Sequence, residues 1–473
     1  MDKVFEGLEP QILWKHFDEI RKIPRCSKNE GKIREYVIEF AKKKGLEYLV
    51  DEVGNVIIRK KATPGHENAP GVILQAHLDM VCEKNSDVDF DFEKDPIRVK
   101  REDGWITADG TTLGADNGVG VAAALAVLDD DSLVHGPLEI LLTVDEETGL
   151  TGASNLKGGL LHGKYLLNLD SEDEGVFFIG CAGGRDTIFT LKIEREKSGE
   201  RAFEVKVSGL KGGHSGVDIH LQRGNAIRIL VRVLYEIDGV KISSIKGGNK
   251  RNAIPREASA VIIAEEEKVK EAVEKVLSQV KEELKYSDPG VKIEYTEASS
   301  SDYIKESKKI VDFLMSLPHG VLAMSLAMEG LVETSTNLAV VNSHQDHVEV
   351  VESSRSSINS SLEFVCKQLK ALGDLAEADT HQPPGYPGWT PNPDSQILKI
   401  MKEVYRNLFG KEPEVTAIHA GLETGIIGKN YPGLEMISFG PTIKYPHSPD
   451  ERVDIKSVEK FWKLLVETLK TLA

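Results

Sequence analysis

The segment GVILQAHLDM (residues 71–80) is a continuous apolar run that ends on a histidine and an aspartate. Such a run is typical of a strand covered on both faces, as in the parallel sheet of an α/β domain. His77 and Asp79 are two residues apart, so in a strand they point the same way, and Asp79 can fix the tautomer of a metal-binding His77. A histidine and an aspartate paired in a loop for stability is the alternative.

The sequence on both sides of this segment alternates between strands and helices. Apolar runs predict strands in NVIIRK (55–60), LEILLTVDEE (138–147) and KYLLNLD (164–170), whereas NGVGVAAALAVLDD (117–130) predicts a helix of small residues. This order predicts a layered α/β domain.

Two amphipathic helices are expected ahead of these strands, over residues 9–22 and 28–44. The second helix has a capping-box pattern, because Ser27 is followed three residues later by Glu30. Gly45 predicts its end.

The pattern changes after residue 188. TIFTLKIERE (187–196) and RAFEVKVSGL (201–210) alternate as half-exposed strands do. The order of elements up to residue 297 is β-α-β-β-α-β, as in a ferredoxin-like unit, and residues 304–372 look like a degraded second copy. A segment rich in Pro and Gly (378–395) leads back to the α/β pattern. We therefore expect one α/β domain, residues 1–188 and 382–473, with an α+β domain of residues 189–381 inserted.

The composition excludes several classes of protein. The 473 residues include 59 basic and 76 acidic ones, a net charge of −17, which disfavours nucleic-acid partners and anionic membrane surfaces. There is no apolar run of 18 residues and no signal-peptide pattern at the N-terminus. The four cysteines are scattered without a C-x-x-C pair, which argues against a disulfide framework or a thiolate zinc site. These features predict a soluble protein of the reducing cytoplasm.

Four further residues of types that bind metals follow other predicted strands or, in one case, come just before the predicted helix of small residues. They are Asp116 in TTLGADNGVG (111–120), Glu147 in LLTVDEETG (141–149), Asp170 at the end of YLLNLD (165–170) and His447 in SFGPTIKYPHSPDE (438–451). The structural alternatives are a helix N-cap for Asp116 and a solvated turn for the acidic run at 145–147, which includes Glu147. Taken together with His77, four of the five follow separate buried strands, and ligands of open α/β sheets collect at those carboxyl ends.

The charges of this set favour two metal ions. Asp116, Glu147 and Asp170 carry three negative charges and a bridging hydroxide adds a fourth, which two divalent cations balance. Histidine and carboxylate ligands without cysteine suit Zn²⁺, with Mn²⁺ or Co²⁺ as the other choices.

With these residues, the chain resembles the aminoacyl-histidine dipeptidases, also called Xaa-His or cytosol non-specific dipeptidases, which are a family of co-catalytic zinc exopeptidases. The resemblance runs nearly end to end. It is carried by IPRCSKNEG (23–31), LQAHLDMV (74–81), GADNGVGVA (114–122), DEETGLTGA (145–153), GGHSG (212–216), NAIPREA (252–258), LVETSTNLAV (331–340), IHAGLETG (418–425) and SFGPTIKYPHSPDE.

The resemblance implies a zinc-exopeptidase-like, three-layer catalytic domain with an inserted ferredoxin-like lid. It also implies individual roles for the metal-binding residues. Asp116 would bridge the two metals, His77 and Asp170 would complete one site, and Glu147 and His447 the other. Glu146 would be the general base that activates a metal-bridging water, and Asp79 the partner of His77.

Other residues would meet the substrate. His214, on the Gly-rich segment LKGGHSGVDIH (210–220), would stabilise the oxyanion, with a solvated turn histidine as the alternative. Asn252 and Arg355 are candidates for binding the substrate's C-terminal carboxylate, with an ordinary surface arginine as the alternative for Arg355. His419 and Glu423 would meet the free α-amino group or else support the metal ligands.

The expected activity is hydrolysis of dipeptides, including Xaa-His substrates such as carnosine. The alternative within the same chemistry is an amidase, carboxypeptidase or tripeptidase that acts on other N-acyl amino acids or short peptides. A non-catalytic metal-binding protein would lack the base or a ligand, and all are present. A nucleotide-binding protein would need a P-loop or a G-x-G-x-x-G turn, and neither occurs. The sequence leaves open the preferred dipeptide and whether the chain forms a homodimer.

Overall fold

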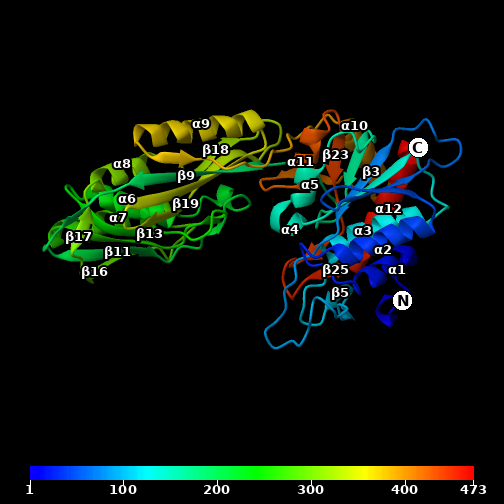
Figure 1. The fold of residues 1–473 in the computed structure, drawn as a ribbon, viewed down its shortest axis with the longest axis horizontal. Coiled ribbons are helices and arrows are strands. Elements are labelled where there is room, and N and C mark those ends of the chain that lie inside the picture. Colours follow the sequence, from blue (N-terminus) through cyan, green and yellow to red (C-terminus); the bar gives the residue numbers. More distant parts are fainter. The chain divides into compact units, whose positions relative to one another are not determined.

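A computed structural model describes all residues of the chain, Met1–Ala473, as two compact units. The first unit consists of residues 1–180, 391–417 and 422–473, and the second of residues 181–390 and 418–421 (Figure 1). The boundaries differ from the expected 188/189 and 381/382. The segment after residue 381 stays with the second unit because Trp389 bridges Cys181 and Tyr386 bridges Gly184.

The first unit is built on an eight-stranded sheet of order β1-β2-β6-β3-β7-β23-β8-β22. Its strands are β1 (Glu47–Val50), β2 (Val56–Lys60), β3 (Val72–His77), β6 (Leu138–Thr143), β7 (Tyr165–Asn168), β8 (Val176–Cys181), β22 (Glu414–Ile418) and β23 (Glu435–Ser438). Strand β3 runs parallel to β6 and β7, and β23 runs parallel to β7. Every residue of β3, β6 and β7 is buried. Both faces of the sheet are therefore covered, as the three-layer arrangement requires.

Helices form the outer layers of this unit. They are α1 (Gln11–Ile20), α2 (Gly31–Lys43), α3 (Ala115–Asp129), α4 (Glu146–Gly149), α5 (Thr151–Asn155), α10 (Gln396–Phe409), α11 (Glu423–Asn430) and α12 (Ile455–Leu472). Helix α3 is buried from Ala115 to Leu128, because its many Ala and Gly residues let it approach the neighbouring backbone closely.

A small four-stranded sheet, which the sequence analysis missed, supports one of the site loops. It has the order β24-β25-β5-β4 and consists of β4 (Val99–Glu102), β5 (Trp105–Ala108), β24 (Ile443–Lys444) and β25 (Arg452–Asp454). The loop between β24 and β25 carries His447. Pairing of β25 with β5 thus anchors this loop to a segment more than 300 residues earlier in the chain.

The predicted capping box at the start of α2 is wrong. The side chain of Ser27 makes no cap, because its hydroxyl donates to Asp79 Oδ2 at 2.8 Å. Glu30 instead accepts from the backbone amides of Lys28 and Asp145, at 2.8 and 3.0 Å. Gly45 does end the helix region, with a φ of 67° that glycine adopts without strain.

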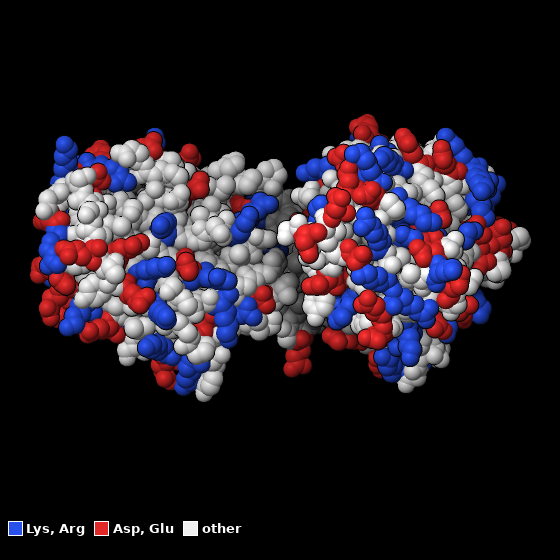
Figure 2. All heavy atoms as spheres, turned by 90° about the horizontal axis from the view of Figure 1, so that it is seen from below, with Lys and Arg blue, Asp and Glu red and all other residues white.

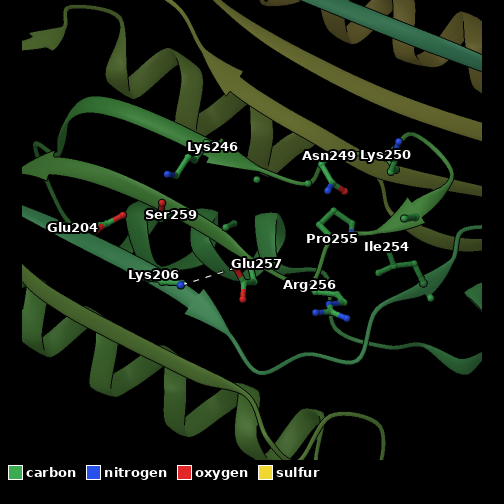
Figure 3. A pocket seen from close by; sticks show the side chains of 15 residues that line it. Glu204, Lys206, Lys246, Asn249, Lys250, Ile254, Pro255, Arg256, Glu257 and Ser259 are labelled. Atoms are coloured by element: carbon green, nitrogen blue, oxygen red, sulfur yellow. Dashed lines mark ion pairs between the residues drawn. The ribbon is translucent and has the colours of Figure 1, made fainter. Parts of the chain in front are cut away.

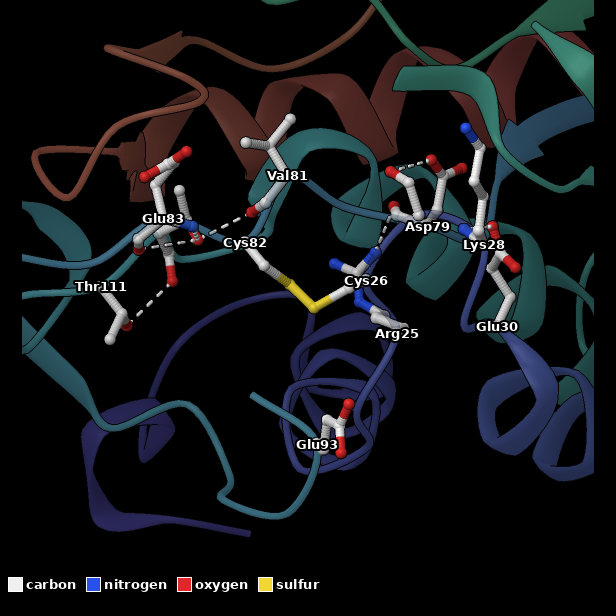
Figure 4. The surroundings of a disulfide bond; sticks show 12 residues. Arg25, Cys26, Lys28, Glu30, Asp79, Val81, Cys82, Glu83, Glu93 and Thr111 are labelled. Atoms are coloured by element: carbon white, nitrogen blue, oxygen red, sulfur yellow. Dashed lines mark hydrogen bonds between the residues drawn. A yellow bond between two sulfur atoms is a disulfide. The ribbon is translucent and has the colours of Figure 1, made fainter. Parts of the chain in front are cut away.

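Two cysteines form a disulfide that the sequence analysis argued against. Cys26 and Cys82 are joined across 56 residues of sequence (Figure 4). Cys26 also pairs with Met80 in a parallel β-bridge. The bond links the segment before α2 to the segment after β3. Cys82 therefore follows Asp79 closely in the chain, and Cys26 stands next to Ser27, whose hydroxyl donates to Asp79.

Reducing this disulfide is expected to lower the free energy of unfolding by about 2–4 kcal/mol, because a closed loop of this length restricts the unfolded chain. Urea unfolding with and without a dithiol reductant measures the effect. A Cys26→Ser/Cys82→Ser variant is the control and should unfold at the reduced midpoint under both conditions. An unfolding midpoint of the wild-type chain that does not respond to reductant contradicts the prediction.

The second unit is an α+β unit built on a nine-stranded sheet. The main path is β16-β11-β15-β13-β19-β20-β9-β21, and β18 pairs with β19. The strands are β9 (Gly183–Lys192), β11 (Ala202–Ser208), β13 (Lys241–Gly247), β15 (Ala258–Ile263), β16 (Lys292–Ala298), β18 (Gly320–Met324), β19 (Val332–Ser343), β20 (His347–Ser356) and β21 (Asp379–His381). The predicted second copy thus extends the sheet of the first, and the two meet where β13 pairs with β19.

Four helices bury the apolar side chains of this sheet. They are α6 (Ala226–Glu236), α7 (Glu266–Glu283), α8 (Ser307–Ser316) and α9 (Asn359–Leu375). Helix α6 starts at Ala226 because Asn225 caps it by accepting from the amides of Ile227 and Arg228. Burial alternates along β11, as expected for a sheet with one open face.

None of the helices combines the length and apolar composition needed to cross a bilayer. On the face drawn in Figure 2, acidic and basic side chains are interspersed over both units.

Candidate metal centre

Five predicted ligands lie together at one edge of the first unit's sheet. His77 is the last residue of β3, and Glu147 and Asp170 come just after β6 and β7. These three strands are neighbours and parallel, so their carboxyl ends meet. Asp116 comes from the first turn of α3, where the Asp116–Asn117 peptide bond is cis, and His447 from the loop between β24 and β25.

The ligands form two groups of three that share Asp116. In the first group, His77 Nε2 lies 3.2 Å from Asp116 Oδ1 and 3.3 Å from Asp170 Oδ1. In the second, His447 Nε2 lies 3.1 Å from Asp116 Oδ2 and 2.9 Å from Glu147 Oε2. The ligand atoms of each group lie within 4.8 Å of one another. Because its two oxygens face different histidines, Asp116 is placed as a bridging ligand would be.

The donor atoms fit divalent cations. Glu147 Oε1 is buried and accepts no hydrogen bond, which is costly for a carboxylate unless a cation lies beside it. The set offers imidazole nitrogens and carboxylate oxygens and no thiolate. This combination suits Zn²⁺, Mn²⁺ or Co²⁺.

The electrostatics of the cluster favour positive charge. Burial raises the pKa of Asp170 to about 7, with His77 opposing the shift. Hydrogen bonds to Asp116 and Glu147 raise the pKa of His447 to about 11. Burial alone would lower the pKa of His77, but the surrounding aspartates raise it well above its usual value. The carboxylates thus favour positive charge at this place, which divalent metal ions would supply.

Asp79 connects the end of β3 to α4. Its Oδ1 lies 3.3 Å from His77 Nδ1, and its carboxylate accepts from the backbone amides of Glu146 and Glu147 at 3.0 and 3.2 Å. Burial opposes its ionisation, but these contacts and the Ser27 hydroxyl lower the pKa of Asp79. Asp79 therefore orients His77 and holds the turn that carries Glu146 and Glu147.

Glu146 lies beside the ligands without belonging to either group of three. It forms a separate cluster with His77 and Glu147. Burial raises the pKa of Glu146 well above its usual value; nearby carboxylates, Asp170 and Glu423 among them, add to the shift and His77 opposes it. A carboxyl group of this kind is suited to accept a proton and release it again.

A buried polar network behind the ligands was only partly predicted. Glu423 Oε2 accepts from Gln75 Nε2 at 2.6 Å and from Thr143 Oγ1 at 2.7 Å, and Asn168 Nδ2 donates to Gln75 Oε1 at 2.5 Å. Burial raises the pKa of Glu423 to about 7. The network ties the ends of β3, β6 and β7 together, which agrees with the supporting role considered for Glu423. Gln75 and Asn168 could have been recognised in the sequence as members of a buried polar network, because they are polar residues inside otherwise apolar strands.

The other candidate residues belong to the second unit. His214 lies on β12 (Gly213–His214), paired with Ala253 on β14 (Ala253–Ile254). Asn252 and Arg355 line a cavity of about 340 Å³. Arg355 is buried; its Nη1 donates to the Tyr386 hydroxyl at 3.1 Å, and its Nε has no partner.

His419 was expected to act together with Glu423, but His419 belongs to the second unit and Glu423 to the first. Its Nε2 lies 2.7 Å from Ser335 Oγ, and its carbonyl oxygen lies next to Gly216. Burial lowers the pKa of His419 to about 3, with Arg355 and His214 adding to the shift. His419 is therefore a neutral histidine packed near Arg355 and His214.

A larger cavity, of about 680 Å³, lies over β11, β13 and β15 (Figure 3). Its walls carry both signs of charge, including Lys206 and Glu257, whose charged atoms are 4.0 Å apart. None of the candidate site residues lines it.

Comparison with known proteins finds a family and several relatives of this chain. A family model described as Peptidase family M20/M25/M40 matches residues 73–471. The chain is 44% identical to the cytosol non-specific dipeptidase of Escherichia coli (strain K12) over 98% of both chains. The structure of the aminoacylhistidine dipeptidase from Vibrio alginolyticus matches with a TM-score of 0.93 and 42% identity, over 99% of this chain and 98% of that one. The aminopeptidase PepT from Bacillus cereus ATCC 10987 shares the fold, with a TM-score of 0.59 and 17% identity over 98% of this chain and 99% of that one.

Proposed function

This chain belongs to peptidase family M20/M25/M40, and we propose that it is a metal-dependent dipeptidase that hydrolyses Xaa-His and other dipeptides. The observation that carries the proposal is the pair of ligand groups sharing Asp116, in a chain with dipeptidase relatives over nearly its full length. His77, Asp116 and Asp170 would hold one metal ion, and Asp116, Glu147 and His447 the other. Zn²⁺ is the metal we propose, with Mn²⁺ or Co²⁺ as substitutes.

The roles of the surrounding residues follow from their places. When bound, two divalent cations supply Lewis acidity toward the scissile carbonyl and the attacking water. Glu146 accepts a proton from that water and delivers it to the leaving amine, for which its raised pKa is suited. Asp79 keeps the imidazole of His77 in place and positions the backbone of Glu146. The role of His214 as oxyanion donor and of the second unit as a lid stays a prediction from the resemblance.

Arg355 is our candidate for binding the substrate's C-terminal carboxylate, together with Asn252. The guanidinium is buried and its Nε is unpartnered, although it borders a cavity that Asn252 also lines. A fork of N–H donors in such a place is suited to a carboxylate.

An Arg355→Ala variant should raise KM for a dipeptide by about 10- to 100-fold, the size of one or two hydrogen bonds to a charged group. Its preference for free dipeptides over C-terminally amidated ones should disappear, because the amide lacks the charge that Arg355 binds. Steady-state kinetics on both substrates measures this. Arg232→Ala, on the outer face of α6, is the control and should behave as wild type. An unchanged preference in Arg355→Ala rules out this role.

The proposed activity is tested with a substrate panel on metal-stripped protein resupplied with Zn²⁺, Mn²⁺ or Co²⁺. We expect cleavage of free-amino dipeptides, including Xaa-His. The related alternative is an amidase, carboxypeptidase or tripeptidase. Cleavage of N-acyl amino acids or tripeptides with no cleavage of dipeptides would favour that alternative and exclude ours.

We also propose a cytoplasmic location, on the strength of the cytosolic relative. The disulfide between Cys26 and Cys82 argues against it, since such bonds are rare in reducing compartments. Alkylation of thiols in intact cells, followed by mass spectrometry, decides between the two: unmodified, paired cysteines contradict the proposal.

A further inference from the structure

A buried carboxylate outside the ligand set grips the loop that carries Asp116. Glu451 is 2% exposed, and its side chain accepts three backbone N–H bonds. Its Oε2 accepts from Leu113 at 2.8 Å and Gly114 at 2.9 Å, and its Oε1 from Asp116 at 3.1 Å. Both oxygens are therefore committed to the turn that delivers the shared ligand.

The same residue belongs to the loop that carries His447. Residues 445–451 connect β24 to β25, and the amide of Glu451 donates to the carbonyl of Ser448 at 3.0 Å. The carbonyl of Glu451 accepts from Thr107 Oγ1 at 3.0 Å, which fixes the backbone against β5. One side chain thus links the loops of Asp116 and His447, whose side chains lie 3.1 Å apart.

A buried cation holds the other side of the Asp116 turn. Arg25 Nη2 donates to the carbonyl of Gly114, and Arg25 Nη1 donates to the carbonyls of Leu78 and Asp79 at 3.1 and 2.7 Å. Arg25 is buried beside the Cys26–Cys82 disulfide (Figure 4). Gly114 has a φ of 71°, and a Cβ there would meet Arg25 Nη2 at 2.6 Å, so the turn has one tightly packed conformation.

We propose that Glu451 is a positioning residue for the metal centre. It holds Asp116 and His447 at the spacing required by the second metal ion, which is the one that Asp116, Glu147 and His447 would bind. The inference rests on the proposed function, because it concerns the ion held by Asp116, Glu147 and His447. The ion held by His77, Asp116 and Asp170 depends less on Glu451, since Glu451 holds only Asp116 of these three ligands, whereas His77 ends β3 and Asp170 comes just after β7. Residues that orient metal ligands typically change metal affinity by about 10- to 100-fold when removed.

A Glu451→Gln substitution separates this role from general support. An amide has one accepting oxygen and presents an NH2 group where the second oxygen was, so at least one of the three N–H bonds is lost. The matched control is Glu139→Gln at the opposite end of β6. Glu139 is also buried, lies 3.2 Å from Arg59 Nε, and accepts from the backbone amides of His162 and Gly163 at 2.7 and 2.8 Å.

The experiment titrates Co²⁺ into metal-stripped full-length protein, following visible absorption and calorimetry. Wild type and Glu139→Gln should bind two ions with the same two affinities. Glu451→Gln should bind the ion of Asp116, Glu147 and His447 about 10- to 100-fold more weakly and the other ion with a smaller loss of affinity, with the absorption of the more weakened ion altered. Two wild-type affinities in Glu451→Gln overturn the inference.

Two further outcomes are separated by the same data. A wild-type chain that binds fewer than two ions contradicts the proposed function itself. If Glu451→Gln does not give the wild-type circular dichroism, Glu451→Asp replaces it. This variant keeps the charge but shortens the side chain by one methylene, so selective weakening of the second ion supports the inference and unchanged affinities overturn it.

Discussion

Glu146→Gln should reduce kcat for dipeptide hydrolysis by about 10²- to 10⁴-fold while both metal ions stay bound. The amide keeps the size of the side chain but cannot accept a proton from the attacking water. Metal binding should persist because Glu146 belongs to neither group of three that shares Asp116. Steady-state kinetics with elemental analysis of the same sample measures both quantities.

The control for this variant is Glu139→Gln, which removes a buried carboxylate at the other end of β6. It should retain wild-type turnover. A kcat of Glu146→Gln within about threefold of wild type would exclude Glu146 as the general base, since that role supplies at least about 10²-fold.

Asp116→Ala should abolish turnover and weaken the binding of both ions, because its two oxygens serve both groups. His447→Ala should weaken only the ion shared with Glu147, since His447 contacts only that group. Isothermal titration of the metal-stripped variants checks both expectations. Circular dichroism confirms that each variant is folded.

The two variants should differ in how many ions they bind weakly, and equal losses would contradict the assignment of Asp116 to both ions and of His447 to one. Asp116→Ala that still binds one ion at wild-type affinity would mean that Asp116 does not bridge. His447→Ala that loses both ions would mean that the two sites are not distinct.

The sheet of the first unit was predictable because its signals are local. Buried parallel strands are continuous apolar runs, and the positions of β3, β6 and β7 followed from them. The order of the strands was not predictable in this way, since β23 reaches β7 from the far end of the chain. The small sheet that anchors the His447 loop was missed for the same reason: its strands are two to four residues long and pair across the sequence.

The metal-binding residues were predictable as a set. The residues that hold them in place were not. Metal-binding residue types at the ends of several buried strands point to one edge of the sheet. The supports depend on contacts between distant segments. Ser27 matched a capping box, but its hydroxyl binds Asp79. Cys26 and Cys82 carried no pairing motif, and nothing in the sequence indicates that Glu451 turns toward Asp116.

The insert was predictable as an α+β unit but not to the residue. Strand β9 starts at Gly183, directly after β8, so no linker marks the crossover. The candidate residues His419 and Glu423 are four positions apart and were expected to act together. They fall in different units, because residues 418–421 pair with the second unit and α11 starts at Glu423 in the first.

Anomalous diffraction at the zinc edge, from crystals of the zinc-loaded protein, tests directly whether the chain holds two metal ions. Two peaks are expected, one among His77, Asp116 and Asp170 and the other among Asp116, Glu147 and His447. The buried acidic group of Glu30, Asp79 and Asp145 should show none, because its carboxylates accept hydrogen bonds from Ser27, Lys28 and their neighbours. A single peak, or a peak in that acidic group in place of one at Asp116, would contradict the two-metal centre.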